Sequence, residues 1–280
     1  MVRLAVPYFG VAFVSIGRTA VAGCIALLIL ALLRDRFPRE HTLSLVLASA
    51  GAMIAYPVFT ALGLRHAPAI HAVVIVGFMP ALTALFAVVR GGERPAPSFW
   101  LACAAGVAAV TGFAIFKGAG HLQGADVFFA LAALACSYAY AEGAVTAKIL
   151  GGWRVVAWGQ VLLLPLTLPM FAWMLHHDGL PHVTSPMAWL AFSDLVFISA
   201  LFGFFLWYMG LARGGTARVG QLQLLQLPLS CVWCMLFLGE RLDFATGLAA
   251  GAVVASALTT MLSRQAVTRP LSCVPLASTT

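Results

Sequence analysis

Long, solid runs of apolar residues alternate with short clusters of charge, glycine and proline along almost the whole chain. The runs show no alternation of apolar and polar positions, so they predict helices rather than half-buried strands. Each run is close to the ~20 residues that a helix needs to cross a hydrocarbon core of ~30 Å. The pattern predicts nine transmembrane helices, at about residues 9–33, 42–62, 68–90, 97–116, 124–148, 153–175, 187–211, 216–238 and 244–263. The remaining tail, residues 264–280, has no helical pattern and is predicted to be disordered.

The composition supports a location in lipid. Of the 280 residues, 62% are hydrophobic and only 9% are charged, whereas soluble domains average about 25% charged residues. The mean hydropathy is +0.99. Because lipid cannot hydrogen-bond to a backbone, only helices and closed barrels cross a bilayer. The sequence therefore predicts an all-α polytopic membrane protein without a soluble domain.

Lys and Arg are distributed unevenly between the two ends of the predicted helices. One end receives eleven of them, namely Arg34, Arg36, Arg39, Arg90, Arg94, Lys148, Arg154, Arg213, Arg218, Arg264 and Arg269. The other end receives Arg3, Arg65, Lys117 and Arg241, and the sixteenth cation, Arg18, lies inside the first helix. Cytoplasmic loops carry the excess of cations. The cation-rich end and the C-terminus are thus predicted to be cytoplasmic, in the plasma membrane (the inner membrane of a bacterium). The net charge of +7 needs no nucleic-acid partner to explain it.

A short acidic phrase occurs twice, as GGERPAPSFW at 91–100 and LGERLDFATG at 238–247. The offset of 147 residues between Glu93 and Glu240 also aligns Gly63-Leu64 with Gly210-Leu211. Predicted helices one to four then match helices six to nine, and the fifth, 124–148, has no upstream counterpart. The chain is predicted to contain two five-helix repeats: 1–117, which lacks its first helix, and 124–263. An odd number of helices turns the second repeat upside down in the membrane, as in many secondary transporters.

The two glutamates are predicted to mark helix boundaries rather than a catalytic site. Pro95 and Pro97 follow Glu93, and Asp243 follows Glu240, as at the start of a helix. A helix N-terminus carries partial positive charge and favours acidic residues nearby. The inversion of the second repeat would place the two side chains at opposite faces of the membrane, so they cannot share one site.

Two longer phrases resemble a known family. LGLRHAPAIHAVVIVGFMPALTALFAVVRGGERP and WYMGLARGGTARVGQLQLLQLPLSCVWCMLFLGERLD are similar to the paired EamA domains of the drug/metabolite transporter superfamily. The resemblance extends over about residues 10–263. It implies ten helices in two inverted five-helix units (5+5), cytoplasmic termini and export of small metabolites. This chain departs from that pattern because it begins at what looks like the second helix, which indicates either a misplaced gene start or a truncation.

Charged residues inside predicted helices are the first candidates for a substrate site, since such charges are costly unless they face a cavity or a partner. Arg18, Glu142 and Asp194 are the three. Arg18 could hold a substrate carboxylate, or it could pair with Glu142 or Asp194. Glu142, with Tyr138 one turn earlier on the same face, either lines a cavity or hydrogen-bonds a neighbouring helix. Asp194 lies near the outer interface.

Uncharged polar side chains supply further candidates for substrate binding. Gln223 and Gln226 are three residues apart and share a helical face, which predicts a cavity lining, with interhelical hydrogen bonding as the alternative. The set is completed by Tyr56, His71 and Gln160, each of which could instead be a packing residue. His71 could titrate near neutral pH, so it and Glu142 are candidates for proton coupling.

The motifs favour a secondary transporter, which exports small metabolites or amino acids by alternating access. No Walker A motif and no nucleotide domain are present, so a gradient or facilitated flux would drive transport. No HExxH motif or paired metal-ligand set appears, and we predict no catalytic residue, no metal and no cofactor. The alternatives are an integral-membrane enzyme, with a metal at His176, His177, Asp178 and His182, or an inactive truncated protein.

The predicted partners are a small-molecule substrate, the lipid bilayer and protons as a coupling ion. The chain would act as a monomer, or as a homodimer through ridges of small residues. Such ridges occur at Ala102 and Gly106 and at Gly247, Gly251 and Ala255.

Overall fold

The computed structural model describes residues 2–67, 72, 77–116, 123–179, 185–226, 229, 232 and 244–262. Every regular element within these residues is a helix. The first half of the chain contains α1 (Val2–Ala12), η1 (Phe13–Gly17), α2 (Arg18–Leu32), η2 (Arg39–His41), α3 (Thr42–Ala50), η3 (Gly51–Ala55), α4 (Tyr56–Leu64), α6 (Met79–Gly91) and α7 (Pro97–Phe116). The second contains α8 (Asp126–Leu150), α9 (Gly152–Asp178), α10 (Pro186–Asp194), η4 (Leu195–Gly203), α11 (Phe204–Gly214), α12 (Thr216–Gly220), η5 (Gln221–Leu225) and α14 (Phe244–Leu262).

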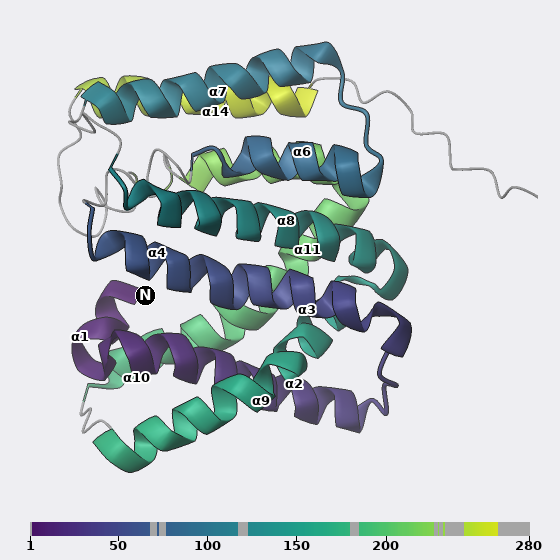
Figure 1. The fold of residues 1–280 in the computed structure, drawn as a ribbon, viewed down its shortest axis with the longest axis vertical. Coiled ribbons are helices and arrows are strands. Elements are labelled where there is room, and N and C mark those ends of the chain that lie inside the picture. The colour runs from purple at the N-terminus through teal and green to yellow at the C-terminus, as the bar shows by residue number, and fades with distance from the viewer. Residues whose placement is uncertain are drawn as a thin grey trace, which may run out of the picture.

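The long helices lie side by side, with α7 and α14 at one edge of the bundle and α9 and α2 at the other (Figure 1). Within the described residues, five stretches are long and apolar enough to cross a membrane: Phe13–Leu32, Arg39–Leu64, Asp126–Leu150, Gly152–His177 and Pro186–Gly214. Met79–Gly91, Pro97–Gly112 and Gly251–Met261 are shorter apolar helices. Each of the nine predicted segments contains a described helix, and the prediction of an all-α polytopic membrane protein is confirmed.

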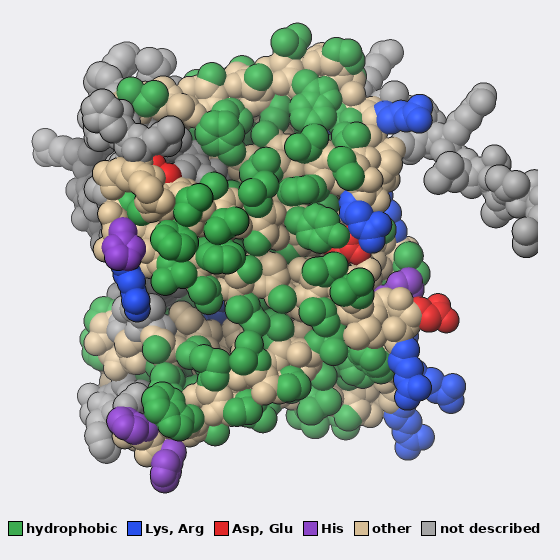
Figure 2. Space-filling view, in the orientation of Figure 1, with side chains coloured by type: hydrophobic (Ala, Val, Ile, Leu, Met, Phe, Trp, Pro, Cys, Tyr) green, Lys and Arg blue, Asp and Glu red, His purple; other side chains and the backbone are tan. Residues whose placement is uncertain are grey.

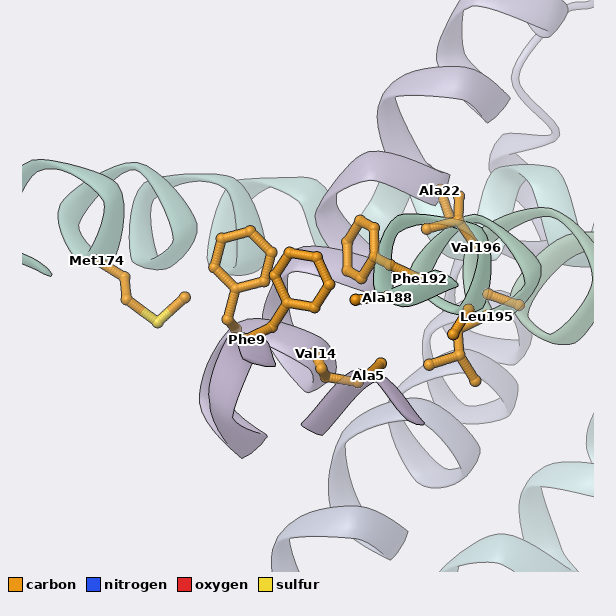
Figure 3. Close-up of a cluster of buried hydrophobic side chains, with 12 residues drawn as sticks. Ala5, Phe9, Val14, Ala22, Met174, Ala188, Phe192, Leu195 and Val196 are labelled. Carbon is orange, nitrogen blue, oxygen red and sulfur yellow. The ribbon is translucent and has the colours of Figure 1, made fainter. Parts of the chain in front are cut away.

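The first predicted segment is not one continuous helix. Gly10 has a φ of 75°, a left-handed value that glycine adopts without strain, and it separates the start of α1 from the helix that follows. Membrane-crossing length is reached from Phe13 to Leu32 instead. Phe9 of α1 packs against Phe192 and the edge of Trp189 from α10, in an apolar cluster that α9 also joins through Met174 (Figure 3).

Two π-helical segments recur at matching places in the proposed repeats. An offset of 147 residues moves Gly51–Ala55 (η3) onto residues 198–202, which lie inside Leu195–Gly203 (η4). A π-helical turn widens the helix and disturbs the usual i→i−4 bonding, and such turns occur frequently at functional sites. The match directs attention to the backbone of η3 and η4, whereas η1 has no such counterpart, because the same offset moves it onto residues 160–164 of α9.

Helix α8 lies between α6 and α4 (Figure 1). It approaches the α3–η3–α4 segment closely because glycine occupies the contact: a Cβ built on Gly51 would lie 2.7 Å from the carbonyl oxygen of Ala135. Farther along, a Cβ on Gly63 would lie 2.5 Å from the ring of Phe129. The centre of the bundle therefore depends on backbone-to-backbone packing across α8.

The ridge of small residues on α7 packs against α14 of the same chain. Ser256 of α14 donates to the carbonyl oxygen of Ala102 at 2.6 Å, and a Cβ on Gly106 would lie 2.5 Å from the Ser256 Oγ. On α14, by contrast, Gly251 and Ala255 are exposed. A homodimer through α14 stays a prediction, whereas the α7 ridge is already occupied.

The described Lys and Arg side chains gather mainly at one end of the helices, beyond a broad apolar surface (Figure 2). Arg90 lies in the last turn of α6, Lys148 in the last turn of α8 and Arg213 in the last turn of α11. We call this the cation-rich end.

Candidate functional site

Glu142 is 1% exposed and forms a bidentate ion pair with Arg90. Arg90 Nε lies 2.5 Å from Oε2 and Nη2 lies 2.8 Å from Oε1. Tyr138 donates a longer bond of 3.4 Å to Oε2, so these two residues share a helical face as predicted. Glu142, one of the two partners proposed for Arg18, is thus paired with Arg90 instead. This ion pair joins α8 to α6 at the cation-rich end.

Glu93 caps the start of a helix other than the one that follows it. Gly92 ends α6 with a φ of 65°, and the Glu93 N–H bonds back to the Ala87 carbonyl at 3.2 Å. The Glu93 carboxylate then accepts from the N–H groups of Thr216 and Ala217, at 2.6 and 2.9 Å. Glu93 lies between the end of α6 and the start of α7, at a helix boundary as predicted. The N–H groups that it binds begin α12, far along the chain, which the sequence did not indicate.

Asp35 is a third buried carboxylate at this end, and the sequence analysis missed it. Its Oδ2 lies 2.5 Å from Arg154 Nη2, and its Oδ1 accepts from Trp158 Nε1 at 3.0 Å. Asp35 lies between Arg34 and Arg36 in the short connection that follows α2. Its contacts fasten this connection to the first turns of α9.

Arg18 differs from these paired charges. Val14 and Ala22, four residues before and after it, are buried in the cluster with Leu195 and Val196 (Figure 3). Arg18 therefore lies on the face of α2 that packs against η4. Its side chain is partly buried, and its Nε is buried without a hydrogen-bond partner among the described residues. The ion pair predicted with Asp194, which is half-buried at the end of α10, is not formed.

Gln160 lies at the meeting point of α2, α9 and η4. It is 1% exposed, and its Nε2 donates to the carbonyl oxygen of Ala200 in η4 at 3.1 Å. Its backbone oxygen would lie 3.1 Å from a Cβ on Gly23 of α2. Ala200 and Ala22 belong to the same apolar cluster. We call the region of Arg18, Gln160 and η4 the α2–α9–η4 junction.

The junction combines unsatisfied groups of opposite polarity. Arg18 Nε is a charged donor without a partner in the described part of the chain. Gln160 Oε1 is a buried acceptor that also has no partner there. Buried polar atoms are nearly always hydrogen-bonded, so each such atom needs an explanation.

The remaining candidates lie elsewhere. Tyr56, half-buried, packs on a cluster that contains Met79 and Cys136. Residues 221–225 form a 3-10 helix, in which Gln223 is half-buried and Gln226 is exposed. Gln221 of the same helix is fully buried and donates to the Pro80 carbonyl at 3.0 Å. His71 lies outside the described residues.

No group of three or more metal-ligating side chains occurs among the residues that the structure describes. His182 and the side chain of Asp178, two of the four residues in the alternative metal site, lie outside that part of the chain.

Comparison with known proteins identifies the family. The profile of the EamA-like transporter family matches residues 1–115 and 123–262. The chain belongs to this family. An uncharacterized transporter of Bacillus subtilis strain 168, YdeK, is 40% identical over 244 residues, which are 87% of this chain and 84% of the relative. A probable terminal-alkyne amino-acid exporter of Streptantibioticus cattleyicolor is 30% identical over 251 residues, or 85% of this chain and 80% of the relative.

A crystal structure of a protein 21% identical in sequence has the same fold, with a TM-score of 0.69 over 93% of each chain. The family match confirms the resemblance to EamA domains, and the protein belongs to the class of transporters. The two family matches also give a natural division: we call residues 2–116 the N-terminal half and residues 123–262 the C-terminal half.

Proposed function

We propose that the protein is a secondary transporter that exports amino acids or closely related metabolites by alternating access. The observation that carries the proposal is Arg18, a cation inside a membrane-spanning helix whose Nε has no protein partner in the described residues. A charge in this position is expensive and is retained where it serves a substrate or a partner. The relative from Streptantibioticus cattleyicolor is a probable terminal-alkyne amino-acid exporter, which supports this substrate class.

Arg18 is proposed to recognise the anionic group of the substrate. A guanidinium group presents parallel N–H donors that match a carboxylate, so Arg18 is proposed to hold the substrate carboxylate. Gln160 Oε1, farther along α9, is a separate buried acceptor without a partner among the described residues.

Protons are proposed to drive export, but not through Glu142 in this conformation. Both carboxylate oxygens of Glu142 already accept hydrogen bonds from Arg90. Protonation of Glu142 would first require these bonds to break. His71 is the other candidate for proton coupling from the sequence.

Transport is tested with purified protein in proteoliposomes loaded with radiolabelled amino acids. We expect saturable efflux that unlabelled substrate competes, and an imposed pH gradient is expected to change its rate. Empty liposomes and liposomes with heat-denatured protein are the controls. Chemical conversion of the cargo would indicate an enzyme instead, and the absence of flux for all amino acids would contradict the proposed substrate class.

The cation-rich end is proposed to face the cytoplasm, as the distribution of Lys and Arg predicts. A single cysteine at Arg36 or Arg65, both exposed and at opposite ends, reports the orientation in a variant without native cysteines. We expect a membrane-impermeant maleimide applied to intact spheroplasts to label Arg65→Cys and to leave Arg36→Cys unlabelled until the cells are lysed. The reverse pattern would show that the topology is inverted.

A further inference from the structure

The buried carboxylates at the cation-rich end share one property: each is held by groups from the other half of the chain. Asp35 of the N-terminal half contacts Arg154 and Trp158 of the C-terminal half. Glu93 of the N-terminal half accepts from the backbone of Thr216 and Ala217 and lies 3.8 Å from Lys148 Nζ. Glu142 of the C-terminal half is held by Arg90 of the N-terminal half. All three cross the same boundary.

These contacts are costly to lose one at a time. The side chains of Asp35, Glu93 and Glu142 are 6%, 9% and 1% exposed. Each uses both of its oxygens in short contacts with charged or N–H donors. Hydrogen bonds to a charged acceptor are the stronger ones in proteins. Loss of the donors would leave a carboxylate buried without compensation, so the three contacts stabilise the closed boundary between the halves.

An apolar contact lies next to these ion pairs. Leu45 of α3 is fully buried and packs with Ala144, Tyr208 and Leu211, which all belong to the C-terminal half. Phe37 of the N-terminal half packs on the same cluster and against the edge of Trp158. At this end, the boundary between the two halves is therefore stabilised both by ion pairs and by Leu45, which packs among side chains of the C-terminal half.

We propose that Asp35, Glu93 and Glu142 form the gate of the transporter at the cation-rich end, and that the structure shows this gate closed. This inference rests on the proposed alternating-access function, because only such a mechanism requires the two halves to separate at this end. Opening the gate breaks the three carboxylate contacts together and withdraws Leu45 from the C-terminal half. Glu93 belongs to the acidic phrase that occurs twice in the sequence. In the gate, its carboxylate binds the start of α12.

The gate is tested by cysteine accessibility in the full-length protein, which requires no substrate. Leu45→Cys, in a variant without native cysteines, places a thiol where the closed gate buries it. The rate of its reaction with N-ethylmaleimide is measured with the gate intact and after Asp35→Asn, Glu93→Gln and Glu142→Gln, singly and combined. We expect each single variant to raise the rate and the triple variant to raise it by about tenfold or more, a change of about 1.4 kcal/mol in gate closure.

Two controls separate gate opening from general loosening. Glu40→Gln alters an exposed carboxylate at the same end and is expected to leave the rate unchanged. Ala188→Cys, a fully buried probe in the cluster with α1 and α10, is expected to stay protected in every gate variant. The proposal is overturned if Leu45→Cys stays protected in the gate variants, or if both probes gain reactivity together. If the triple variant does not fold, the single variants decide by the same two criteria. A failure to transport amino acids would leave these labelling results intact, so the two proposals fail separately.

Discussion

Arg18→Met is expected to reduce amino-acid export by at least about tenfold and up to about 150-fold. One hydrogen bond to a charged group contributes about 1.5–3 kcal/mol, which corresponds to these factors. Met retains the apolar stem of the side chain and removes only the guanidinium group. Arg18→Lys keeps the charge but loses the planar pair of donors, so an intermediate loss is expected. Initial rates of efflux from proteoliposomes give kcat/KM for each variant.

A stability measurement separates substrate binding from a structural role. Because Arg18 Nε is buried without a partner among the described residues, Arg18→Met removes a desolvated charged group and should leave the Tm of the purified protein unchanged or raise it. A structural ion pair would give the opposite sign, since loss of one partner of a buried pair is strongly destabilising. Arg65→Met removes an exposed arginine and is the matched control. Normal export by Arg18→Met, or a fall in its Tm, would refute the assignment of Arg18 to the substrate.

Structural features that depend only on neighbouring residues along the chain were predicted correctly from the sequence. Apolar runs of the right length located a helix in each of nine segments, because a helix in lipid must satisfy its own backbone. The helical period placed Tyr138 beside Glu142, and the contact is present. The cost of a charge in lipid singled out Arg18 without any knowledge of its surroundings.

The partners of the charged side chains could not be predicted in the same way. Glu142 meets Arg90, which is 52 residues away, and Glu93 meets Thr216, which is 123 residues away. Such pairs depend on which helices pack together, and no local period encodes that order. The π-helical segments were not predicted from the sequence either, although η4 supplies the carbonyl oxygen that accepts a hydrogen bond from Gln160. Asp35 was overlooked because a charge between two arginines looks like part of a solvated connection.

Close packing of α8 gives the other large expected effect. Gly51→Leu is expected to prevent recovery of folded, monodisperse protein. Its Cβ would lie 2.7 Å from the Ala135 carbonyl oxygen and 2.8 Å from the Ala139 Cβ. Backbone and Cβ atoms cannot rotate away as the end of a flexible side chain can, so the α3–η3–α4 segment and α8 would have to separate. Overpacking in a core usually costs about 1–3 kcal/mol, and displacement of a whole helix exceeds this range.

The matched control is Gly112→Leu in α7, where a new Cβ would meet nothing within 4 Å. Leu forms helices better than Gly by up to about 1 kcal/mol, so this variant should be as stable as the parent protein or slightly more stable. Size-exclusion profiles in detergent and thermal unfolding monitored by circular dichroism compare the two variants directly. A Gly51→Leu protein with the parent Tm would show that α8 does not approach η3 this closely. The proposed gate movement would then have to be reconsidered as well, because α8 carries Glu142 and is the helix against which the N-terminal half closes.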